Sequence, residues 1–273
     1  DLRPAGPDDP RTAAGTGTLG KAMEVLELIA LAEKPLRFTD VLKQIDQPRG
    51  TLHRQISNLV GEGLITVNPD NSYSAGTRLL KLAARAWSQN SLRSAAEPHI
   101  RALHEATGET VHLGQMNGLE VIYLDKIESK QTVRMHSQVG NASPLYCTGI
   151  GKAMMAELPE DQAAELAAQF NFVQHTPTTH ASVKKILSEL QDIRAKGISH
   201  DREEHEPGIY CVAAAIVPDR KQANGGMIGG ISVTSPAYRL DKKTIKVWEK
   251  LVAETANAIE SDVANLLGPR HQN

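Results

Sequence analysis

The chain has 273 residues, of which 40% are hydrophobic and 4% aromatic, and its 30 Lys and Arg against 32 Asp and Glu give a formal net charge of −2. A chain of this length and composition has enough apolar residues to bury one or two ordinary globular cores. Its apolar runs are far too short to span a bilayer and its first residues do not form a signal peptide, so we expect a cytoplasmic protein without membrane contact.

The first residues differ in composition from those that follow. Residues 1–18 are rich in Pro, Gly, Thr and Asp, and their apolar surface is too small to order them, so we predict a flexible tail. From Leu19 onward, apolar residues recur at the spacing of one helix face until the EKP stretch. A second helix is expected to begin at Thr39, because threonine is a good N-cap residue.

The next elements complete a small domain. Pro48 is well placed in the first turn of a third helix, because proline lacks the N–H that a helix start leaves unpaired anyway. Two short alternating runs, 64–67 and 72–75, are joined by Asn-Pro-Asp-Asn and predict a β-hairpin. Three helices followed by a hairpin are typical of a winged helix-turn-helix, which we assign to residues 19–76.

The third helix presents a face without negative charge. The stretch QPRGTLHRQISNLV contains no Asp or Glu, and Leu52, Ile56 and Leu59 form the stripe that would pack on the first two helices. The outward side chains are all donors or neutral groups: Arg49, Thr51, His53, Arg54, Ser57 and Asn58. Because phosphates repel carboxylates and because Arg and Asn can address base edges, this face is predicted to enter the major groove of double-stranded DNA. The alternative is a solvated face in a winged-helix adaptor that contacts only proteins.

An apolar helix is expected between the two halves of the chain, in residues 77–92. Its apolar face is too wide for one small domain to cover, and consists of Leu79, Leu80, Leu82, Ala83, Ala86 and Trp87. We interpret it as a linker that also pairs two or four copies of the chain. The alternative is that it packs only on its own winged domain.

The second half, residues 93–268, mixes strands and helices. Strand-like runs are predicted at 110–116, 119–127, 132–136, 208–217 and 226–234. Helical stretches are predicted at 151–156, 160–169, 182–196 and 241–267. Because the strands fall in two blocks around helices, we expect an α+β domain with an antiparallel sheet.

Several motifs together resemble one family. LGKAMEVLELIA, PRGTLHRQISNLVGEGLI and YSAGTRLLKLA are similar to the amino-terminal domain of IclR-family bacterial transcriptional regulators, and PLYCTGIGKAMMAELP, HDREEHEPGIYCVAAAIV and GGISVTSP resemble its carboxy-terminal domain. The resemblance covers about residues 19–267. It implies a GAF-like domain that binds a small-molecule effector, and a homodimer or homotetramer that binds operator DNA as a repressor or an activator.

The resemblance also implies an effector pocket. It places Asp201, Ile209, Cys211, Ser232 and Thr234 there, and the i, i+2 spacing independently puts Ser232 and Thr234 on one strand face. With the apolar Met135, such a pocket would suit a small organic acid or an aromatic metabolite.

The TGIGKA stretch is a further candidate for this pocket. It is no Walker A loop, because Tyr146 and Ala153 stand where that motif needs Gly and Ser or Thr. Gly149 and Ile150 instead allow a close backbone approach at a helix start, where free N–H groups favour a carboxylate. A tight turn without a ligand is the alternative.

No metal, cofactor or catalytic site is predicted. The HDREEHEPG stretch has no HExxH spacing, and in an extended strand its charged groups would alternate between opposite faces. Cys147 and Cys211 are too few for a disulfide framework and are expected to be buried thiols. The less favoured alternative is a metal-dependent enzyme that uses His200, Asp201 and His205.

Overall fold

The computed structural model describes residues 17–131, 137–219 and 227–267, which form two compact units that divide after Gln89. The predicted tail, 1–18, lies outside the described residues except for its last two positions. These two positions belong to the first helix, which begins at Gly17 rather than at Leu19.

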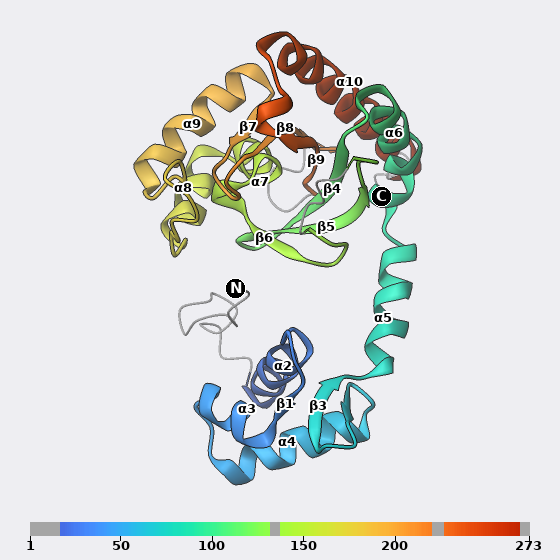
Figure 1. Cartoon of the computed structure of the whole chain (residues 1–273), viewed down its shortest axis with the longest axis vertical. Helices are drawn as coiled ribbons and strands as arrows, with labels where there is room; N and C mark the ends of the chain where they lie inside the picture. The colour runs from blue at the N-terminus through green and yellow to red at the C-terminus, as the bar shows by residue number, and fades with distance from the viewer. Residues whose placement is uncertain (1–16, 132–136, 220–226, 268–273) are drawn as a thin grey trace, which may run out of the picture. The chain divides into compact units, whose positions relative to one another are not determined.

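The amino-terminal unit is a winged helix-turn-helix (Figure 1). Its elements are α2 (Gly17–Ala30), β1 (Leu36–Arg37), α3 (Phe38–Gln44), α4 (Arg49–Gly61), β2 (Ile65–Val67) and β3 (Ser72–Ala75). The strands form an antiparallel sheet in the order β1-β3-β2. The predicted stripe of Leu52, Ile56 and Leu59 is buried against Val25 and Ile29 of α2, so the three helices and the hairpin are confirmed.

Two predicted helix starts are wrong by one position. Thr39 is not an N-cap, because α3 already begins at Phe38 and the Asp40 carboxylate accepts the Arg37 N–H at 3.0 Å. The carboxylate of the third helical residue thus accepts the N–H of the residue that precedes the helix, as in one half of a capping box. Pro48 stands just before α4 rather than inside it, and its carbonyl accepts the N–H of Thr51 at 2.9 Å.

The predicted linker helix is α5 (Thr77–Ser88), and it contains no buried residue. Leu80, Leu82 and Trp87 are 73%, 54% and 39% exposed. Within the described part of the chain, Leu79 is the one residue of this helix that packs against the core of the winged domain. A single copy of the domain therefore leaves most of the apolar face of α5 open to solvent.

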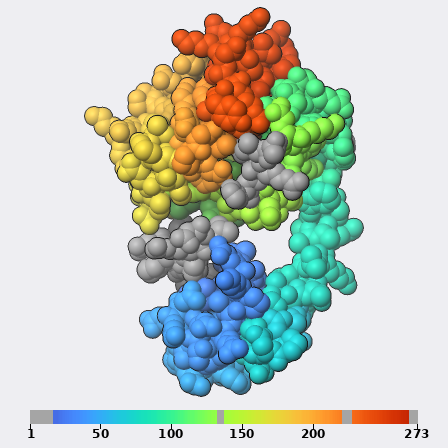
Figure 2. Space-filling model, viewed as in Figure 1, coloured from blue at the N-terminus to red at the C-terminus, as the bar shows by residue number. Residues whose placement is uncertain are grey.

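The carboxy-terminal unit is built on the predicted antiparallel sheet, which has six strands and is curled (Figure 1). From edge to edge it runs β6 (Ala142–Pro144), β5 (Glu120–Ile127), β4 (Thr110–Asn117), β9 (Gly229–Pro236), β8 (Ile209–Ile216) and β7 (Ser199–Arg202). The helices are α6 (Ser91–Thr107), α7 (Gly149–Ala156), α8 (Glu160–Ala168), α9 (Val183–Lys196) and α10 (Lys242–Leu267). In the space-filling view, α8 and α9 (yellow to gold) and α10 (red) lie on the surface of this unit (Figure 2).

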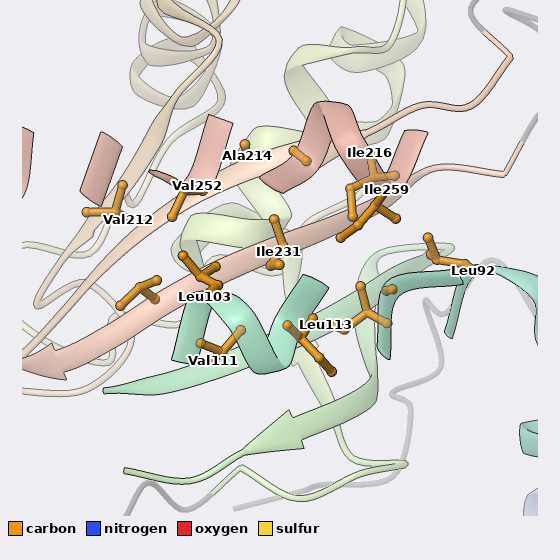
Figure 3. Close-up of a cluster of buried hydrophobic side chains, with 14 of the residues drawn as sticks. Leu92, Leu103, Val111, Leu113, Val212, Ala214, Ile216, Ile231, Val252 and Ile259 are labelled. Carbon is orange, nitrogen blue, oxygen red and sulfur yellow. The ribbon is translucent and has the colours of Figure 1, made fainter. Parts of the chain in front are cut away.

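Each face of this sheet has its own core. Val111, Leu113, Val212 and Ile231 point to the side covered by α6 and α10, where they pack with residues such as Val252 (Figure 3). The opposite side chains belong to a second cluster around α7 and α9. Strand alternation thus separates an apolar layer from the face that carries the candidate effector residues.

One α-helix and two strands of this unit were not predicted, and one predicted strand cannot be compared with the structure. Helix α6 contains Pro98, which obscures its pattern, but the Asn90 side chain caps its first turn and Gly108 ends it at a φ of 70°. Strands β6 and β7 are only 3 and 4 residues long, too short to show a period. The strand expected at 132–136 lies outside the described residues, and α7 begins at Gly149, two residues earlier than expected.

Candidate functional site

The proposed DNA-reading face is intact on α4. Five of its six predicted side chains are exposed and Thr51 is partly exposed, while Leu52, Ile56 and Leu59 are buried on the opposite side. These polar groups are therefore not buried when the domain folds, and they remain available to bind a partner.

An aromatic side chain that the sequence analysis did not single out orders this face. The Arg49 guanidinium lies 5.4 Å from the Phe38 ring centroid, and the His53 ring lies 5.9 Å from it. A cation held over an aromatic face keeps its charge while losing some side-chain freedom. Within the described residues, no carboxylate forms an ion pair with Arg49 or Arg54, so both charges are uncompensated.

The turn of the wing, residues 68–71, contains one carboxylate and no Lys or Arg. Asp70 accepts hydrogen bonds from the Ser72 hydroxyl at 2.6 Å and from the Ser72 N–H at 3.1 Å, and these bonds lower the pKa of Asp70. Arg37 of β1 approaches the same carboxylate at 3.9 Å. Asn71 adopts a φ of 62°, which asparagine tolerates. The tip thus offers no free cation among these residues, and α4 carries the positive charge.

The predicted effector residues meet on the α7 side of the sheet. Asp201 lies opposite Cys211, and Cys211 lies opposite Thr234. Ser232 shares the face of Thr234 by alternation, and Ile209 shares that of Cys211. The exposed fractions of Asp201, Cys211, Ser232 and Thr234 are 6%, 6%, 1% and 6%. These groups therefore form a patch of polar side chains that is almost closed to solvent.

The start of α7 approaches this patch. A Cβ added to Gly149 would lie 3.0 Å from Cys211 Sγ and 3.4 Å from the Asp201 backbone nitrogen, so a side chain at this position would crowd both neighbours. Ile150 is buried beside it, and Thr148 caps the helix by accepting the Gly151 N–H at 3.2 Å. The predicted residue Met135 lies outside the described residues.

Burial sets the charge state of the patch. It raises the pKa of Asp201 to about 7, although the Glu204 N–H donates to its carboxylate at 2.7 Å and opposes the shift. Burial also raises the pKa of Cys211 to about 12 and outweighs the hydrogen bonds from Thr234 and Ser232. Near neutral pH the Cys211 thiol is therefore protonated, and Asp201 is poised between its two forms.

The structure adds residues that the sequence analysis missed. His112 of β4 lies opposite Ser232, and its ring approaches the Thr234 hydroxyl at 3.3 Å and the Ser137 hydroxyl at 2.7 Å. Burial, together with the charge of Lys126, lowers the pKa of His112 to about 3, so this ring is neutral. The sequence feature that could have identified His112 is its position in TVHLGQM, where it alternates with the apolar residues of β4.

Lys152 is a second residue that the sequence analysis did not use. Its ammonium group is fully buried, 2.6 Å from both carboxylate oxygens of Glu204 and 3.0 Å from Glu189 Oε1. His180 donates to Glu189 on the other side, and Arg202 approaches the same carboxylate at 3.6 Å. This ion-pair network joins α7, α9 and the loop that follows β7.

The grouping expected for a metal-dependent enzyme is not formed. The His200 ring points away from Asp201, because β7 is extended and sends adjacent side chains to opposite faces, as predicted. His200 lies 3.1 Å from Glu249 and 3.0 Å from the Tyr210 hydroxyl. In the described part of the chain, His200 and Asp201 belong to no group of side chains with metal-ligand geometry.

Two family models match the chain. The model of the bacterial transcriptional regulator IclR C-terminal domain matches residues 84–261, and that of the IclR helix-turn-helix domain matches residues 18–69. The chain belongs to the IclR family. The predictions of the family and of its α+β fold are thereby confirmed, and the chain is a DNA-binding transcriptional regulator.

Curated relatives and solved structures agree with this assignment. The chain is 30% identical to the regulator XynR of Escherichia coli over 88% of this chain and 94% of that one, and 28% identical to BhcR of Paracoccus denitrificans over 92% and 89%. The Thermotoga maritima IclR structure matches with a TM-score of 0.67 and 28% identity over 90% of this chain and 98% of that one. An IclR homolog of Microbacterium hydrocarbonoxydans, solved with 4-hydroxybenzoate, matches in fold with a TM-score of 0.71 and 20% identity over 91% and 100%.

The relatives named here are transcriptional regulators rather than enzymes. None of the helices in the described part of the IclR-family chain combines the length and the hydropathy that a membrane crossing requires.

Proposed function

We propose that this IclR-family chain reads one half of an operator with α4 and responds to a small carboxylic acid bound on the α7 side of its sheet. The observation that carries the proposal is the pairing of two unusual surfaces in one chain. One is an exposed helix face without carboxylates, and the other is a closed patch of hydroxyls around Asp201.

The α4 face has the chemistry of base readout. Arg49 and Arg54 supply donors for guanine or phosphate, and Asn58 supplies a donor and an acceptor for adenine. The stabilising contact of Arg49 with Phe38 leaves its charge free for DNA. Because a single helix reads only a few base pairs, a genome-specific site requires two copies of the domain. The exposed apolar residues of α5 are the surface that we propose for this pairing.

The DNA-reading role is tested by selecting binding sites from a pool of random duplex oligonucleotides and measuring affinity against salt concentration. Arg49→Ala and Arg54→Ala should each weaken binding, and loss of one phosphate contact should reduce the log–log salt slope by about 1. A lost base contact should instead cost roughly 1–3 kcal/mol and relax selectivity at one base pair. Lys250→Ala, which removes an exposed charge from α10, is the control. Parent-like binding by both arginine variants would refute the assignment.

The effector site has the chemistry to hold a carboxylate. The start of α7 provides backbone N–H groups, Ser232 and Thr234 provide hydroxyls, and Ile150 provides an apolar wall. A raised pKa lets Asp201 carry a proton and donate to an acid instead of repelling it. The homolog solved with 4-hydroxybenzoate supports an aromatic acid as one member of the ligand class.

The effector role is tested by thermal shift with a panel of small carboxylic acids that includes 4-hydroxybenzoate. A ligand that binds the folded state raises its apparent stability. Ser232→Ala should weaken the binding of any acid that scores, by roughly ten- to a hundredfold, because a buried polar contact is lost. Ser235→Ala, on the opposite face of the same strand, is the control. Equal responses in parent and Ser232→Ala would exclude Ser232 from the site.

A further inference from the structure

Three side chains outside the proposed effector site converge in the carboxy-terminal unit. Cys147 ends the short 3-10 helix η1 (Leu145–Cys147), His175 lies in the loop between α8 and α9, and His205 lies in the loop after β7. One ligand atom from each lies within 4.8 Å of the other two. Cys147 is buried, His205 is partly buried and His175 is exposed. The group thus has a closed end and an end that is open to solvent.

Hydrogen bonds hold the three segments in place around this group. The Thr176 hydroxyl donates to the Glu203 carbonyl at 2.6 Å, and the Thr179 hydroxyl donates to the Glu204 carbonyl at 2.6 Å. These bonds tie the loop of His175 to the loop of His205. The Tyr146 hydroxyl, next to Cys147, donates to the Val173 carbonyl at 2.9 Å and accepts the Val173 N–H at 2.9 Å. The group is therefore built into the fold and needs no large rearrangement to act together.

The same tyrosine sets the proton position on one imidazole. Tyr146 uses its own proton for Val173, so it can only accept a proton from His175 Nε2, which lies 3.4 Å away. This contact favours the tautomer with the proton on Nε2 and leaves a lone pair on Nδ1. An orienting hydrogen bond of this kind is the usual support of a histidine that binds a metal.

We propose that Cys147, His175 and His205 bind a zinc ion. A thiolate and two imidazoles are ligands that zinc prefers, and three protein ligands leave the fourth tetrahedral position for water on the exposed side of His175. Calcium and magnesium are disfavoured, because they require oxygen ligands. On binding, the Cys147 thiol loses its proton to solvent and its sulfur binds the metal.

Among the described residues, the other group with metal-ligand geometry does not compete as a site. His180, Glu189 and Glu204 also place their ligand atoms within 4.8 Å of one another. The Lys152 ammonium already lies between Glu204 and Glu189, at 2.6 Å and 3.0 Å. A cation fixed by the chain occupies this position, so a second cation would be repelled.

The zinc site would tie together segments that carry the effector patch. Cys147 lies close in sequence to Gly149, and His205 follows Asp201 in the loop after β7. A metal bridge between η1 and this loop would restrict their separation. Zinc therefore offers this regulator a second input, which acts on the geometry of the patch without occupying it.

The proposal is tested by titrating the chelator-treated full chain with Zn²⁺ alone, in competition with a chromophoric chelator. One ion per chain should bind, and Co²⁺ in its place should give a thiolate-to-metal charge-transfer band. His175→Asn and Cys147→Ser should each lower zinc affinity by at least about tenfold, and Cys147→Ser should abolish the band. Cys211→Ser and His53→Asn are the matched controls, and both should bind zinc with the affinity of the parent.

Because His175 is exposed, its replacement should leave folding unchanged, which circular dichroism verifies. Failure of the parent protein to bind zinc would refute the proposed site. So would parent-like affinity in both His175→Asn and Cys147→Ser, or a cobalt complex without a thiolate band.

Discussion

Replacement of Lys152 by Met should be strongly destabilising. The change keeps most of the side-chain volume but removes the ammonium that faces Glu204 at 2.6 Å, and Glu204 has a side chain only 4% exposed. Removing one partner of a buried ion pair leaves an uncompensated charge and costs about 3–5 kcal/mol. This corresponds to a factor of roughly 10²–10⁴ in the folding equilibrium. Glu189 suffers less, because it keeps His180 and Arg202.

Urea denaturation followed by circular dichroism measures this loss. Lys184→Met, an exposed change on α9, is the matched control and should stay within about 0.5 kcal/mol of the parent. The double variant Lys152→Met/Glu204→Gln should recover about half of the loss or more, because it removes the stranded charge. A loss below about 1 kcal/mol in Lys152→Met, or no recovery in the double variant, would refute the buried ion pair.

Three further changes test other parts of the chain. Burial raises the pKa of Asp201 to about 7, against about 3.9 in the unfolded chain, so between these values the folded state keeps a proton that the unfolded state releases. The free energy of unfolding should therefore decrease as the pH rises from about 4 to about 7. Asp201→Asn should flatten that decline in denaturation curves, and an unchanged slope would contradict it. Leu82→Glu on α5 should lower the mass measured by light scattering, whereas an unchanged mass and DNA affinity would exclude this face as the interface. Gly151→Ala should cost about 1–3 kcal/mol of unfolding free energy, because its Cβ would lie 2.3 Å from the Leu145 carbonyl oxygen, whereas Gly61→Ala meets open space and is the control.

The local pattern of the chain was sufficient to predict most elements of the fold. The stripe of Leu52, Ile56 and Leu59 and the alternation of Ser232 and Thr234 both depend on residues a few positions apart, and both are confirmed. Helix α6 was missed because Pro98 signals a break, yet neighbouring contacts of the tertiary structure hold the helix together. Strands as short as β6 and β7 have no period to detect.

The candidate binding sites could be predicted only in part from the sequence, for a related reason. Neither the pairing of Lys152 with Glu204 nor the meeting of Cys147, His175 and His205 depends on local spacing, since sheet register and loop closure bring these residues together. From the sequence, His205 could be grouped only with its sequence neighbours, and a buried thiol was the default expectation for Cys147. A pattern of residue types along one segment cannot reveal a group formed from three.

Strand β9 is buried on both faces, with Ile231 and Val233 in one core and Ser232 and Thr234 in the other layer. The apolar and the hydroxyl residues therefore meet different requirements, although they alternate over four successive positions, 231–234. Under the proposed function, substitutions at the hydroxyl positions would alter which ligand the domain binds, while the apolar positions keep the sheet packed against α10. A strand of this kind would let ligand preference diverge among descendants of one scaffold, because the proposed ligand-binding positions and the packing positions are different residues.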